Sequence, residues 1–235
     1  MNILHEKNYD AMSDRAAEIL AAQVVLKPAC VLGLATGSSP VGMYRRLAEQ
    51  YRQGMLDFSA VTSVNLDEYC GLAPEDPQSY RYFMEENLFR RINIRRENTF
   101  VPDGLSPDRA AACAAYDARL AALGGIDMQV LGIGHNGHIG FNEPDDHFTA
   151  GTHVVELKES TIRANARFFE DISQVPTQAI TVGMRTILQA KRILLLAGAD
   201  KADIVRQAMT GPVTPQVPAS LLQLHPNVTV VQADA

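Results

Sequence analysis

The chain has 235 residues, a hydrophobic content of 46% and a formal net charge of −6 at pH 7. This length suits one domain of ordinary α/β size and the composition is ample for a buried core, so we expect residues 1–235 to form a single domain. The acidic balance argues against nucleic acid and against an anionic membrane as partners.

No targeting or membrane signal is evident in the sequence. The N-terminal segment MNILHEKNYD lacks the apolar stretch of a secretory signal, and no apolar run reaches the length of a membrane span. Three cysteines, Cys30, Cys70 and Cys113, are odd in number and scattered, which suits free thiols in a reducing compartment. We therefore expect a cytoplasmic protein with no membrane attachment.

Strand and helix patterns alternate along the chain. Helix signals include Asp10 as an N-cap, Pro40 at a first helical position and Gly54 at a helix end. In chain order, the sequence predicts a strand from residue 2, a helix at 10–26, a strand at 30–34, a helix at 40–54, a strand at 61–66, helices at 79–91 and 106–124, strands at 128–133 and 193–197, a helix at 200–209 and a strand at 228–231. This alternation implies a three-layer α/β/α sandwich with a mainly parallel sheet. Residues 145–175 depart from the rhythm, and we expect an insertion or lid there.

The most informative segment is VLGIGHNGHIGFNEP, residues 130–144. Its apolar run breaks into glycines, which is how a buried parallel strand ends, and ligands of open α/β sheets bind just outside such ends. The polar residues among and after the glycines are His135, Asn136, His138, Asn142 and Glu143. Two imidazoles and a carboxylate at that place suit proton transfer on a small molecule.

Three other interpretations of residues 130–144 stay open. Gly132, Gly134 and Gly137 match the dinucleotide pattern G-x-G-x-x-G, although the following HIGFNEPDDHFTAG is a poor helix. A metal site is the second, although no histidine pair has the spacing of one helical face and no cysteine is nearby. Its ligands would be His135, His138, Glu143 and His147. The third is a glycine-rich turn with incidental polar residues.

The segment ATGSSP follows the predicted strand at 30–34. Its small residues let backbone N–H groups face a ligand, its hydroxyls add donors, and the next helix directs its positive end there, which together describe a phosphate cradle. The cradle would consist of Thr36, Gly37, Ser38 and Ser39. It has no P-loop lysine, which argues against a nucleoside triphosphate. The alternative is an ordinary strand–helix turn with an N-cap serine.

Two further strand ends carry charged residues. Asp67 and Glu68 follow the strand at 61–66. Two adjacent carboxylates at a strand end form a solvated turn or a helix cap, or, at a shared active edge, one of them is a catalytic base. Lys201 lies in the first turn of a predicted helix, an unfavourable place for a cation unless the lysine and the helix end bind one anion together. Because the carboxyl ends of parallel strands meet along one edge, the sequence predicts acid–base chemistry on a small phosphate ester, with sugar phosphates as the natural candidates.

Four motifs, LGLATGSSP, SVNLDEYCGL, GIGHNGHIGFNEP and ANARFF, resemble in order and spacing those of the glucosamine-6-phosphate deaminase family. The resemblance covers nearly the whole chain. It implies a Rossmann-like fold shared with ribose-5-phosphate isomerase and a single catalytic domain. It also implies conversion of glucosamine 6-phosphate to fructose 6-phosphate and ammonia in amino-sugar catabolism, without a metal or other cofactor.

The resemblance implies a role for each site residue. His138 would open the pyranose ring, and Glu143 would orient its imidazole and balance its charge. Asp67 would take the C2 proton and return it at C1, while Asn136, where some members carry aspartate, would hold His138 by hydrogen bonding. The phosphate ligands would be Thr36, Gly37, Ser38, Ser39, Arg167 and Lys201. A lid at about 157–176 is expected to carry the arginine to the phosphate.

Larger members of the family have a longer C-terminal segment and form hexamers activated by N-acetylglucosamine 6-phosphate. This chain stops soon after Val231, so we expect a short, non-allosteric form that is a monomer or small homo-oligomer. One alternative function is a 6-phosphogluconolactonase-like hydrolase, which shares the fold and a related loop but fits the DEY and GFNEP segments less well. Another is a non-catalytic sugar-phosphate sensor, which would need an attached DNA-binding module.

Overall fold

A seven-stranded sheet, in which every neighbouring pair of strands is parallel, forms the centre of the molecule. The computed structural model describes residues 1–158, 162 and 171–234. The sheet has the order β1-β10-β9-β6-β2-β3-β5. Its strands are β1 (Asn2–Glu6), β2 (Val31–Leu34), β3 (Thr62–Asn65), β5 (Thr99–Phe100), β6 (Met128–Gly132), β9 (Ile193–Ala197) and β10 (Val228–Ala233). The predicted mainly parallel sheet is confirmed.

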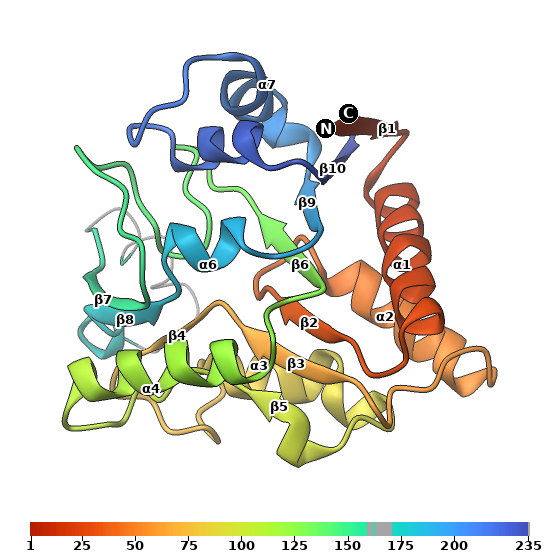
Figure 1. Ribbon diagram of the computed structural model, residues 1–235, viewed down its shortest axis with the longest axis horizontal. Coiled ribbons are helices and arrows are strands. Elements are labelled where there is room, and N and C mark those ends of the chain that lie inside the picture. Colours follow the sequence, from red (N-terminus) through yellow and green to blue (C-terminus); the bar gives the residue numbers. More distant parts are fainter. Residues whose placement is uncertain (159–161, 163–170, 235) are drawn as a thin grey trace.

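Helices cover both faces of this sheet and complete the predicted three layers. Figure 1 shows α1 and α2 on one side of the sheet and α4 and α6 on the other. The helices are α1 (Tyr9–Leu26), α2 (Val41–Arg52), α3 (Tyr80–Asn87), α4 (Arg109–Ala122), α6 (Met184–Leu188) and α7 (Ala202–Thr210). Covered faces explain why the central strands are apolar without alternation: every residue of β9 is buried. In the described part of the chain, no helix combines the length and apolar character needed to cross a bilayer.

Helix starts differ from the predicted ones where a nearby side chain makes the better cap. The side chain of Asn8 accepts a hydrogen bond from the third helical N–H of α1, so Asp10 lies in the first turn and is not the N-cap. Asp108 does the same for α4, which therefore begins after the predicted start at 106. Ser79 caps α3, but this helix ends at Asn87 and continues only as a 3₁₀ turn.

A second, antiparallel sheet was not predicted. It has the order β4-β8-β7, with β4 (Asp67–Tyr69), β8 (Gln178–Thr181) and β7 (His153–Glu156). These strands have only three or four residues each, too few for a period-2 pattern to stand out. Residues 145–175, expected as an insertion or lid, therefore include a strand. Of the predicted lid at 157–176, residues 159–161 and 163–170 lie outside the described part.

An ion cluster joins the amino ends of two strands. Asp127, whose side chain is 4% exposed, accepts hydrogen bonds from Lys27 and Lys191 at 2.7–2.8 Å and from the Val31 amide at 2.9 Å. Burial alone raises the pKa of this carboxyl, but the hydrogen bonds outweigh burial and hold its pKa at about 2. The cluster ties the start of β6 to β2 and to the end of α1.

We expect Asp127→Asn to lower the free energy of unfolding at neutral pH by about 1–3 kcal/mol. The folded pKa of about 2 lies below the usual 3.8, so the stabilisation is present above about pH 4 and is lost as the pH falls toward 2. Urea unfolding at pH 7 and at pH 3 would measure both effects. Asp203→Asn is the control, because its exposed pair with Arg206 should contribute less than about 1 kcal/mol. Equal losses in the two variants would contradict the prediction.

Candidate active site

A cavity of about 540 Å³ opens where the chain leaves β2, β3 and β6. This is the position that ligands take in open α/β sheets, at the carboxyl ends of the strands. Most of the site residues predicted from the sequence line it: Thr36, Gly37, Ser38, Ser39, Asp67, Asn136, His138 and Glu143. Lys201 lines an adjoining cavity that shares Ser38 and Ser39 with the first. Arg167 lies outside the described residues.

The predicted phosphate cradle is the loop between β2 and α2. Gly37 has a φ of +87°, a backbone conformation that side-chain-bearing residues rarely adopt. The Tyr9 hydroxyl donates to the Ser38 carbonyl at 2.8 Å and accepts from the Gly42 amide at 2.9 Å. Tyr9 therefore ties the loop to the first turns of α1 and α2. The sequence carries no signal for this contact, because 29 residues separate Tyr9 from Ser38.

The structure distinguishes between the two adjacent acidic residues. Asp67 is 6% exposed and lines the cavity. Glu68 points away from it and accepts hydrogen bonds from the amides of Tyr69, Tyr80 and Arg81 at 2.8–2.9 Å. Glu68 thus holds the first turn of α3, whereas Asp67 faces the ligand space. The alternative of a solvated turn is wrong for both residues, since both belong to the buried strand β4. The helix-cap alternative fits Glu68, which accepts from the first two amides of α3.

Asp67 is buried, and no cationic side chain in the described part of the chain pairs with it. Burial, with a smaller contribution from the charge of Glu68, raises the pKa of Asp67 to about 8. Among the described residues, no side chain or amide donates a hydrogen bond to this carboxylate. The backbone of the histidine loop passes close to it, because a Cβ atom at Gly140 would lie 3.3 Å from Asp67 Oδ2 and 2.9 Å from Thr181 Oγ1. A carboxyl group in this environment is a suitable general base.

Tyr80 and Phe141, with Tyr69 packed against them, form an aromatic wall beside Asp67. The rings of Tyr80 and Phe141 are parallel to within 6°, with centroids 5.9 Å apart, and Tyr69 lies 4.8 Å from Tyr80. Tyr80 and Phe141 line the cavity beside Asp67. Sequence reasoning missed this wall, because no motif separates an active-site aromatic residue from a core one.

His138, Asn136 and Glu143 form a hydrogen-bonded chain in the cavity wall. Asn136 Nδ2 donates to Glu143 Oε2 at 2.6 Å, and Asn136 Oδ1 accepts from the His138 backbone amide at 3.2 Å. A carboxylate only accepts and a backbone N–H only donates, so both partners orient the amide in the same way. Asn136 Oδ1 also lies 2.7 Å from His138 Nδ1. Nδ1 therefore carries the hydrogen, and the neutral ring keeps its lone pair on Nε2.

The surroundings of His138 favour the neutral imidazole. Burial lowers the pKa of His138, and the nearby Glu143 carboxylate, 3.5 Å from Nδ1, opposes this shift. The positive charges of Lys201 and Lys158 lower the pKa further. The ring also lies directly against Gly134, where an added Cβ atom would overlap it. A neutral ring with a free Nε2 is ready to accept a proton.

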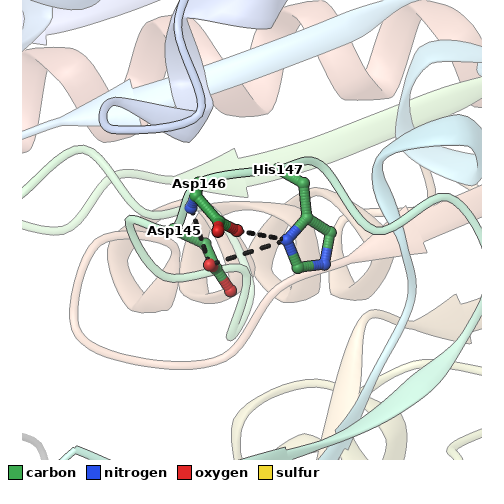
Figure 2. A group of neighbouring side chains, drawn as sticks. All are labelled: Asp145, Asp146 and His147. Carbon is green, nitrogen blue, oxygen red and sulfur yellow. Dashed lines mark hydrogen bonds and ion pairs between the residues drawn. The ribbon is translucent and has the colours of Figure 1, made fainter.

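The structure does not support two of the alternatives for residues 130–144. No helix begins at Gly137 in the fully described stretch 133–152, so the dinucleotide fingerprint lacks the helix it requires. Among the described residues, the one group of acidic and histidine side chains close enough to share a metal is Asp145, Asp146 and His147 (Figure 2), not the predicted set. All three are exposed, and His147 already contacts Asp146 at 2.6 Å.

Known proteins similar to this chain act on sugar phosphates, the class of ligand that the geometry of the cavity suits. The sequence matches the family described as glucosamine-6-phosphate isomerases/6-phosphogluconolactonase over residues 5–231. The glucosamine-6-phosphate deaminase of Lachnoclostridium phytofermentans is 62% identical over 232 residues, which cover 98% of each chain. A solved structure described as a monomeric glucosamine-6-phosphate deaminase matches with a TM-score of 0.96 at 45% identity, over 99% of this chain and 97% of that one. A 6-phosphogluconolactonase from Thermotoga maritima matches with a TM-score of 0.79 at 18% identity, over 100% and 99%.

Proposed function

Because the chain belongs to the family of glucosamine-6-phosphate isomerases and 6-phosphogluconolactonases, we propose that it converts glucosamine 6-phosphate and water to fructose 6-phosphate and ammonia. The observation that carries this proposal is the pairing, in one cavity, of a desolvated carboxyl group with a tautomer-fixed histidine. Asp67 and His138 both line the cavity that holds the phosphate cradle. An aldose–ketose isomerisation needs a base at C2 and a separate group that opens the ring, and the two residues supply them.

Substrate binding begins at the phosphate. The amides and hydroxyls of Thr36, Gly37, Ser38 and Ser39 surround the phosphate at the start of α2, where the helix dipole favours an anion. Lys201, whose side chain is 17% exposed, adds a positive charge from the adjoining cavity. The role of Arg167 remains a prediction from the family resemblance, and the lid at 157–176 remains a prediction from the sequence pattern, because most of that segment lies outside the described residues.

Ring opening is the task of His138. Nε2 takes the proton of the anomeric hydroxyl and delivers it to the ring oxygen, which leaves an open aldehyde. While the ring is protonated, Nδ1–H stays bonded to the Asn136 amide, and the charge of Glu143 stabilises the imidazolium. The uncharged Asn136 amide lies between Glu143 and the imidazole of His138 and is hydrogen-bonded to both.

Asp67 then carries out the isomerisation. Its carboxylate takes the proton from C2 while the substrate ammonium gives one of its protons to the C1 oxygen, which leaves an enolamine. The carboxyl group then returns its proton to C1. The nitrogen at C2 is thereby left as an imine, which water hydrolyses to the ketone and ammonia. A substrate ammonium at C2 favours the charged carboxylate, because an opposite charge nearby lowers the pKa that burial has raised to about 8.

The two alternative functions have less support. The 6-phosphogluconolactonase match at 18% identity shows the fold alone, whereas the deaminase relatives reach 62%. Lactone hydrolysis also requires no base aimed at a C2 proton, so it leaves the position of Asp67 unexplained. A sensor would bind the sugar phosphate without needing the tautomer-fixed His138.

We further propose that residues 1–235 act as one catalytic unit, as a monomer or small homo-oligomer without an allosteric activator. The similarity to a deaminase described as monomeric supports this proposal. The three cysteines are free and buried, which supports a cytoplasmic location. Acting in amino-sugar catabolism, the enzyme would work without nucleic acid, membrane or cofactor.

We expect purified protein, given glucosamine 6-phosphate alone, to release ammonia and fructose 6-phosphate in equal amounts. The rate should be a hyperbolic function of substrate and unchanged by millimolar N-acetylglucosamine 6-phosphate, since allostery requires a second site and two states that bind the effector differently. Coupled assays of both products would measure this. Turnover of 6-phosphogluconolactone in place of the amino sugar would replace the proposal with the hydrolase function. A sigmoidal curve that the effector makes hyperbolic would contradict the non-allosteric part.

A further inference from the structure

We propose that His135 is a further contact for the substrate phosphate, an inference that rests on the proposed function. The proposed mechanism leaves this residue without a role. His135 lines the main cavity and also the adjoining one that contains Lys201. Ser38 and Ser39 are the other residues that line both. His135 therefore lies where the phosphate cradle and the lysine meet.

Asp200 holds His135 beside Lys201. His135 Nε2 lies 3.4 Å from Asp200 Oδ2, and Lys201 Nζ lies 3.2 Å from the same oxygen. Two nitrogens that share one oxygen are close enough for a single phosphate to contact both. The Asp200 carboxylate thus lies between His135 and Lys201 next to the cradle, although these two residues come from different loops.

An imidazole N–H at this position can donate a hydrogen bond to a phosphate oxygen. The side chains of His135 and Asp200 are 73% and 65% exposed, so the imidazole can turn from the carboxylate to a bound phosphate. This contact would add to those of the cradle and of Lys201.

The test is direct binding of glucosaminitol 6-phosphate, the reduced substrate, which can neither open a ring nor enolise. We expect His135→Ala to raise the Kd about three- to tenfold. His135→Lys, which restores a donor to the phosphate at this position, should bind nearly as well as the wild type. With glucosamine 6-phosphate, His135→Ala should raise KM with little change in kcat, because the contact does not touch the reacting atoms.

His147→Ala is the matched control. His147 is an exposed histidine paired with acidic neighbours (Figure 2), but it does not line either phosphate cavity. The variant removes an imidazole from the molecule in the same way, so its Kd should stay at the wild-type value. Equal Kd values for the two variants, or a wild-type Kd for His135→Ala, would overturn the assignment. If the wild type does not bind the reduced substrate at all, the proposed function fails instead.

Discussion

Asp67→Asn is expected to reduce kcat by about 10²–10⁴-fold while binding of glucosaminitol 6-phosphate is retained. The amide keeps the size of the side chain but cannot accept the C2 proton. In deuterated solvent, the wild type should exchange the C2 proton of the substrate and the variant should not. Wild-type kcat/KM should rise with pH through about 8, because burial and the charge of Glu68 raise the pKa of Asp67 to that value and only the carboxylate acts as a base.

The same substitution should stabilise the fold. The folded pKa of Asp67, about 8, lies above its usual 3.8, so the folded protein binds this proton more tightly than the unfolded chain does. The stability associated with that proton is present below about pH 4 and is lost as the pH rises through about 8. Removal of the charge by Asp67→Asn should therefore raise the free energy of unfolding at pH 8 by at least about 1 kcal/mol, with a smaller gain near pH 4.

Thermal unfolding of both proteins at the two pH values would check the gain. Near-wild-type turnover would remove Asp67 from the role of base, and an equal stability at pH 8 would contradict the account of its burial. Glu68→Gln provides a contrast. Glu68 accepts hydrogen bonds from three backbone amides of β4 and α3. Glu68→Gln should therefore lower the free energy of unfolding, whereas Asp67→Asn should raise it.

Gly134→Ala is expected to lower kcat by about 10²-fold, although alanine is a conservative change. The ring of His138 occupies the space that a Cβ atom at Gly134 would need. Because Gly134 does not have a positive φ, alanine adds no backbone strain, and the expected effect is displacement of the imidazole. If the ring moves by about 1 Å, Nε2 no longer lies in the right position to exchange a proton with the anomeric hydroxyl and the ring oxygen.

A double-mutant cycle separates this effect from general damage. In a His138→Ala background the methyl group at position 134 has no ring to displace, so the second substitution should cost little further activity. Binding of glucosaminitol 6-phosphate should be close to normal in the single variant. Additive losses in the cycle, or a normal kcat for Gly134→Ala, would show that the loop accommodates the methyl group elsewhere.

Local patterns in the sequence were enough to predict the elements that carry the site. Strand β6 is apolar because both its faces are buried, and the glycines that end it are visible in the sequence. The phosphate cradle after β2 and the His138–Glu143 loop after β6 could be predicted in the same way, because each directly follows a buried apolar strand. Each is a short segment whose chemistry is complete within a few residues, and a parallel sheet brings such segments to one edge.

Tertiary structure alone decided how these groups work. Asp67 and Glu68 are neighbours in the sequence. Their difference arises because Glu68 accepts from amides of α3, 12 and 13 residues away, while Asp67 lines the cavity beside the aromatic wall. The tautomer of His138 depends on which atoms of Asn136 face Glu143 and the backbone. Tyr9 reaches Ser38 across 29 residues. Burial and hydrogen-bond direction are properties of the packed chain, so residue type and spacing determined which chemistry was available, and packing determined which group performs each step.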